Sequence, residues 1–181
     1  MNKHFNAGII FDILLYGTLL ILLSVLQTTL IPRFPIYDSV PDIMLGAVCC
    51  IGIYRKEKCA AVFGLIAGLC SDALGSVGLS LLPLFYTLVG YFSGLIGDNA
   101  REKARFAAFL ITIPAVSFAK IALSFFHHII NYYETIELGQ LFLYTLLPEF
   151  VYTLFLCIPS FLLVKLFDIP LNILRKRGGY R

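Results

Sequence analysis

Charge is scarce in this chain, and its scarcity excludes an ordinary soluble domain. Only 14% of the 181 residues are charged, whereas 59% are hydrophobic. A soluble domain of this length would carry about 25% charged residues. The net charge of +3 is also too small to indicate a nucleic-acid partner. The composition therefore predicts one integral membrane domain over residues 1–181, because no polar region is long enough to fold alone.

Motifs of catalysis and metal binding are also lacking. The sequence has no Walker loop, no H-E-x-x-H or G-x-S-x-G motif, and no recognisable Ser-His-Asp set. Its five cysteines lie in or beside apolar runs without C-x-x-C spacing, which is typical of small buried hydrophobes. The adjacent His127 and His128 would point about 100° apart on a helix, which makes a poor metal pair. We therefore expect no enzymatic activity, no metal site and no cofactor.

Six long apolar runs are present instead. The second is short, since a helix over Val40–Tyr54 would be roughly 22 Å long, against a hydrocarbon core of about 30 Å. The first is too long for a signal peptide and is interpreted as a retained span. We predict an all-α bundle of six membrane helices at about Gly8–Ile31, Val40–Tyr54, Cys59–Leu79, Leu81–Gly97, Phe106–Ile130 and Leu141–Lys165. The prolines expected to kink these helices are Pro83, Pro114, Pro148 and Pro159.

Basic residues predict the orientation of this bundle. In a six-span arrangement, Arg33 falls on one side and nearly all other basic residues fall on the opposite side. Because cytoplasmic loops are enriched in lysine and arginine, both termini of this multi-pass membrane protein are predicted to be cytoplasmic. The residues on the cytoplasmic side are Lys3, Arg55, Lys56, Lys58, Arg101, Lys103, Arg105, Lys165, Arg175, Lys176, Arg177 and Arg181.

Four ionisable residues lie inside predicted spans at a common depth. Asp42, Asp72, Lys120 and Glu149 are each about 20 Å from the cytoplasmic end of their helix, at about 1.5 Å per residue. We expect them to form a buried polar cluster in the outer half of the membrane, with Lys120 as counter-ion to the carboxylates. Such a cluster either fixes helix register or serves as a proton or ion relay or a ligand pocket, and the sequence leaves both open.

Small residues at a spacing of four predict close helix packing. Gly64, Gly68 and Asp72 share one face of the third span, and Gly90 and Gly94 follow Tyr86 at the same spacing in the fourth. In lipid, such faces let two helices approach closely enough for dispersion contacts to hold them together.

The segment LQTTLIPRFPIYDSVPDIML, followed by GLIAGLCSDALGSVGLSLLPLFYTLVGYFSGLIG, resembles the rod shape-determining membrane protein MreD family. The features that carry the resemblance are Gln27 near the end of the first span and Pro41-Asp42 opening the second. The stripe that ends at Asp72 and the Tyr86, Gly90 and Gly94 spacing complete it. The resemblance is strongest over residues 20 to 98, and the last two spans match mainly in hydropathy.

The resemblance implies a non-enzymatic scaffold of the bacterial cell-wall elongation complex that contributes to rod shape and lies in the bacterial inner membrane as a multi-pass protein. The implied partners are an MreC-like bitopic protein, a RodA-like glycosyltransferase with its class B transpeptidase and, indirectly, the MreB filament. The implied architecture is similar to that of the substrate-binding membrane subunits of energy-coupling-factor transporters. The alternative is such a vitamin-type transporter subunit, although the first span has no Ala-x-x-x-Ala motif for docking an energising module. An ion-coupled carrier would show inverted repeats, and none is evident.

Overall fold

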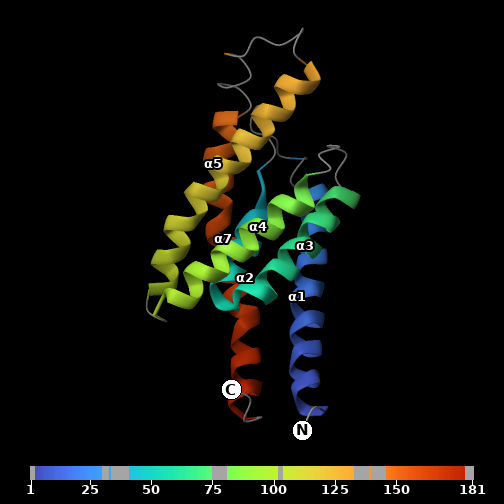
Figure 1. Cartoon of the computed structure of the whole chain (residues 1–181), viewed down its shortest axis with the longest axis vertical. Coiled ribbons are helices and arrows are strands. Elements are labelled where there is room, and N and C mark those ends of the chain that lie inside the picture. Colours follow the sequence, from blue (N-terminus) through green and yellow to red (C-terminus); the bar gives the residue numbers. More distant parts are fainter. Residues whose placement is uncertain are drawn as a thin grey trace.

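A short helix, α2 (Ile43–Tyr54), lies at the centre of the protein and contacts the five other helices that the structure describes (Figure 1). Every residue from Ile43 to Ile53 is buried. The sequence explains this position, because IMLGAVCCIGIY has no polar side to turn toward water. A helix that is apolar all round belongs inside a protein or a membrane.

The computed structural model describes residues 3–29, 33, 41–74, 81–101, 104–132, 139 and 146–177. This part of the chain is all-helical, as predicted. The helices around α2 are α1 (Lys3–Thr29), α3 (Glu57–Leu74), α4 (Leu82–Asn99), α5 (Arg105–Tyr132) and α7 (Leu147–Arg177). Successive helices alternate in direction, so α1 begins and α7 ends at the same end of the molecule (Figure 1).

The tightest pairing is between the antiparallel helices α3 and α4, and glycine makes it possible. A Cβ atom on Gly64 would collide with the backbone of Tyr86, and one on Gly90 would collide with the backbone of Ala60. Gly68 faces Pro83 and Gly94 faces Glu57 in the same way. The predicted small-residue faces therefore pack against each other inside the protein, where no further helix can use them.

The predicted helix boundaries need correction at α7 and at two prolines. The last span was expected to end at Lys165, but α7 continues through Asp168 to Arg177. Pro83 and Pro148 lie in the first turns of α4 and α7, where a missing backbone N–H costs nothing, so they do not interrupt a helix. Pro114 and Pro159 do lie inside helices. Residues 75–79 and 141–145, assigned above to the third and last spans, lie outside the described residues.

The outward faces of the helices are apolar. Ile111 is 74% exposed, Phe155 72% and Phe118 70%, and α1, α3 and α4 also carry exposed large hydrophobic side chains. Within the described ranges, two helical stretches are long and apolar enough to cross a membrane, Arg105–Phe126 and Leu147–Leu166. Only 28% of each is buried, so neither resembles the core helix of a soluble protein.

Candidate functional site

Asp42 occupies the N-cap of α2 and anchors a set of buried polar contacts. Its backbone is extended, and its Oδ1 accepts a hydrogen bond of 3.1 Å from the backbone N–H of Leu45. Aspartate is favoured at this position because it satisfies a backbone donor that the first helical turn leaves without a partner. Its negative charge also lies at the positive end of the helix dipole. Pro41, directly before it, is buried as well.

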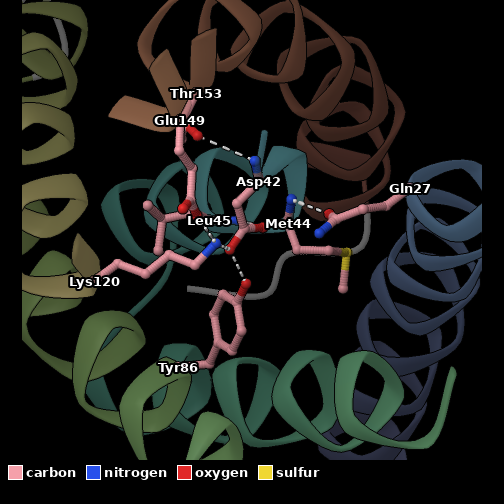
Figure 2. A network of polar contacts seen from close by, with 8 residues as sticks. All are labelled: Gln27, Asp42, Met44, Leu45, Tyr86, Lys120, Glu149 and Thr153. Atoms are coloured by element: carbon pink, nitrogen blue, oxygen red, sulfur yellow. Dashed lines mark hydrogen bonds and ion pairs between the residues drawn. The ribbon is translucent and has the colours of Figure 1, made fainter. Parts of the chain in front are cut away.

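Lys120 of α5 joins two carboxylates from two other elements (Figure 2). Its Nζ lies 2.8 Å from Oδ2 of Asp42 and 3.0 Å from Oε1 of Glu149 on α7. The Asp42 side chain is 1% exposed, and those of Lys120 and Glu149 are 15% and 14% exposed. The hydroxyl of Tyr86, on α4, donates a hydrogen bond to the same Oδ2. The Asp42 carboxylate thus has a hydrogen-bond or ionic partner on each of its oxygens.

Two further contacts hold the first turn of α2 between α1 and α7. The backbone N–H of Met44 donates to Oε1 of Gln27, on α1, at 3.1 Å. The backbone N–H of Asp42 donates to Oγ1 of Thr153, on α7, also at 3.1 Å. We call these side chains the Asp42 network; its members are Gln27, Asp42, Tyr86, Lys120, Glu149 and Thr153, and they come from α1, α4, α5, α7 and the N-cap of α2 (Figure 2).

The structure brings together three of the four ionisable residues expected to cluster, and Asp72 is the exception. Asp72 lies in the last turn of α3 and is partly exposed. Within the described residues it makes no hydrogen bond or ion pair with Asp42, Lys120 or Glu149. The reason is which helices are neighbours: α3 packs mainly on α1, α2 and α4, whereas Lys120 and Glu149 lie on α5 and α7. Two residues at the same distance along their helices do not meet unless the helix faces that carry them pack against each other.

A second buried ionic group lies at the other end of α2, and sequence reasoning missed it. Nη2 of Arg55, the C-cap residue of α2, lies 3.2 Å from Oδ1 of Asp168 on α7. The hydroxyl of Tyr16, on α1, donates to the same oxygen at 2.8 Å, and the Arg55 guanidinium lies 5.0 Å from the centre of the Tyr16 ring. Arg55 was interpreted as a loop residue that signals topology, and Asp168 received no role. Asp168 within the apolar run FLLVKLFDIPLNIL was the available signal.

Charged residues of opposite sign therefore lie at the two ends of α2, with Asp42 at the N-terminus and Arg55 at the C-terminus. The Asp42 carboxylate caps the N-terminus, and the cationic Arg55 is the C-cap residue, an order of charges that is favourable for a helix dipole. Helix α7 supplies partners at both ends, Glu149 and Thr153 at one and Asp168 at the other. This arrangement is suited to holding α1, α4, α5 and α7 in register around α2.

The charged side chains at each end of α2 form ion pairs with one another. No set of three or more His, Cys, Asp or Glu side chains that could hold a metal ion occurs within the described part of the chain. Cys49, Cys50 and Cys157 are buried free thiols, and Cys59 is an exposed one. The His127 and His128 side chains, and Glu134 and Glu137, lie outside the described residues.

Comparison with protein-family models, with curated proteins and with solved structures finds no match to this chain. The fold class defined by the geometry is an α-helical protein organised about a buried central helix with an ionic group at each end.

Proposed function

We propose that the chain is a six-span membrane protein with both termini in the cytoplasm. The alternating helix directions and the common end of α1 and α7 support this arrangement (Figure 1). Large apolar side chains face outward on α1, α3, α4, α5 and α7, while the ionic groups face inward. This distribution suits hydrocarbon surroundings and would be a liability in water. At about 18 Å, α2 is too short to cross alone, but it is enclosed by protein.

We further propose that the protein is a non-enzymatic scaffold of the bacterial cell-wall elongation complex, as its resemblance to the MreD family implies. One observation carries this proposal: three of the residues that carry the resemblance converge on one place. Gln27, Asp42 and Tyr86, which are far apart in sequence, meet at the first turn of α2. Gly64, Gly68, Gly90 and Gly94 pack the helix pair that presents Tyr86. Residues that carry the resemblance therefore lie around the central helix α2.

The partners of such a scaffold would bind its outer surface. The proposed partners are an MreC-like bitopic protein, a RodA-like glycosyltransferase with its class B transpeptidase and, through them, the MreB filament. Because the glycine faces of α3 and α4 are used inside the protein, the surfaces left for partner helices are the exposed apolar faces. Contacts of this kind between membrane helices depend on shape and dispersion.

Affinity purification of the tagged chain from native membranes in mild detergent tests the proposal. Co-purification of the bitopic protein with the glycosyltransferase–transpeptidase pair, identified by mass spectrometry, is the expected result. A tagged, unrelated six-span protein expressed at the same level is the control. Recovery of paired ATPases with a coupling subunit would instead identify a vitamin-type transporter subunit. Retention of the chain in the supernatant after removal of membranes would exclude both functions.

A further inference from the structure

Helix α5 is packed into the protein along only part of its length. Its first half contributes four buried side chains, at Phe109, Thr112, Ile113 and Ser117. The Phe109 ring lies 4.7 Å from the ring of Phe161 on α7, centre to centre. Beyond Ser117 the packing changes, because none of residues 118–126 and 129 is fully buried. We call residues 118–132 the outer arm of α5; Figure 1 shows it extending beyond the ends of α3 and α4.

Pro114 lies inside α5, close to where the packed half gives way to the outer arm. A proline here has no N–H to donate to the carbonyl of Leu110, and its ring crowds that carbonyl. Sharp helix bends occur at such positions. Membrane helices tolerate them where neighbouring groups satisfy the freed carbonyl. The break in hydrogen bonding therefore falls near the change in packing.

Lys120 gives the outer arm its two ion pairs with the rest of the described protein. The pairs run to Asp42 at the N-cap of α2 and to Glu149 in the first turn of α7 (Figure 2). Both are side-chain contacts at a single position, so separating them requires no rearrangement of the buried half of α5.

We propose that the outer arm of α5 swings about Pro114 as one unit, and that Lys120 holds it closed by binding Asp42 and Glu149. The closed position dominates, because opening would leave carboxylates without their ammonium partner in an apolar environment. Opening exposes Asp42 and Glu149 from the side of α5 while the rest of the bundle keeps its packing. This inference does not depend on the scaffold proposal.

Distances between spin labels measure the motion directly. One label replaces Phe126, which is 64% exposed in the outer arm, and its partner replaces Leu69, which is 54% exposed on α3. A second pair joins Leu69 to Ile111, which is 74% exposed on the packed half of α5. Cys59→Ser and Cys70→Ser remove the thiols that are not buried. The protein is studied as the full chain in lipid nanodiscs.

Lys120→Met is expected to broaden or shift the Phe126–Leu69 distance distribution and to leave the Ile111–Leu69 distribution unchanged. A bend of about 20° at Pro114 would move Phe126 by about 6 Å, since twelve residues form a lever of about 18 Å. Adding Pro114→Ala is expected to narrow the distribution again, because it restores the backbone hydrogen bond. Lys165→Met, which removes an exposed lysine from α7, is the matched control and is expected to change neither distance.

An unchanged Phe126–Leu69 distance in Lys120→Met would overturn the proposal. Equal changes in both distances would also overturn it, since they would report general loosening of the bundle. If Lys120→Met does not fold, amide hydrogen exchange of the wild-type chain tests whether the outer arm moves as one unit. Residues 118–126 should then exchange together and faster than residues 105–113, and uniform protection along α5 would reject the hinge.

Discussion

Nζ of Lys120 lies 2.8 Å from Oδ2 of Asp42, and this contact joins α5 to the N-terminus of a helix that has no exposed residue between Ile43 and Ile53. The same ammonium binds Glu149 at 3.0 Å. Removing one partner of a buried ion pair leaves the other charge without compensation, which is more costly than never having had the pair. The consequences can be measured at several positions.

Lys120→Met is expected to lower the free energy of unfolding by about 3–5 kcal/mol, because two carboxylates lose their counter-ion. Thermal unfolding in detergent, followed by circular dichroism, measures the change. The matched control is Lys165→Met on the exposed side of α7, where a change within about 0.5 kcal/mol is expected. Equal melting temperatures for Lys120→Met and wild type would show that the Asp42 network does not stabilise the bundle.

Gly64→Ala is expected to destabilise the protein by about 1–3 kcal/mol, because the added methyl group meets the Tyr86 backbone and forces α3 and α4 apart. Gly17→Ala is the control: a Cβ there has no atom within 4 Å, so the gain in helix propensity should stabilise by about 0.5–1 kcal/mol. Yield of folded protein and melting temperature report both effects. Similar results for the two variants would contradict the packing of α3 on α4 through glycine. Gly68→Leu, which faces Pro83, should lower the yield further.

Asp168→Leu and Arg55→Met are each expected to destabilise by about 3–5 kcal/mol, because each leaves a buried charge behind. The double variant should be more stable than the sum of the two single effects predicts, since it removes both charges together. A double-mutant cycle on thermal unfolding gives the coupling energy. Strict additivity would mean that Arg55 and Asp168 stabilise the protein independently of each other.

Asp98, in the last turn of α4, gives the protein a pH dependence. A shared hydrogen bond with Glu57 and then burial raise the pKa of Asp98 above its ordinary value, and Lys56 and Arg105 oppose the shift. The folded state therefore holds this proton more tightly than the unfolded state does. Its stabilising contribution is present at low pH and is lost as pH rises through the folded pKa.

Asp98→Asn is accordingly expected to be slightly more stable than wild type at pH 7, by no more than a few tenths of a kcal/mol because the site is exposed to solvent. The advantage should shrink as pH falls and disappear below the ordinary aspartate pKa of about 3.9, where the carboxyl is protonated in both the folded and the unfolded state. Melting temperatures of both proteins across this range test the sign. An advantage that grows as pH falls would show that the carboxylate form of Asp98 is the stabilising one.

Much of the architecture could be predicted because hydropathy identifies helices well. All six described helices lie where apolar runs were expected, and counting residues along them placed Asp42, Lys120 and Glu149 at one level. The same count could not exclude Asp72, because depth along a helix says nothing about which neighbour a side chain faces. The choice between neighbours depends on packing between distant segments, here through Gly64 and Gly90.

The ionic group at Arg55 was missed for a different reason. Hydropathy ended the last span at Lys165, while the helix continues and carries Asp168 to the C-terminus of α2. A helix inside a protein ends where its backbone hydrogen bonds and its packing partners end. Mean hydropathy along the sequence reports neither of these. Tyr16 lies within the first apolar run, where average hydropathy does not reveal that its hydroxyl binds Asp168.

Because α7 contacts both ends of α2, the order of synthesis bears on assembly. The partner of Arg55 on α7 follows it by 113 residues, and Thr153 follows Asp42 by 111. The central helix is therefore synthesised well before its contacts with α7 can form. Completion of the core must wait for α7, so folding of the centre is a late event. A chain interrupted before α7 would leave α2 without its contacts to that helix at either end, a state open to recognition by quality-control proteases.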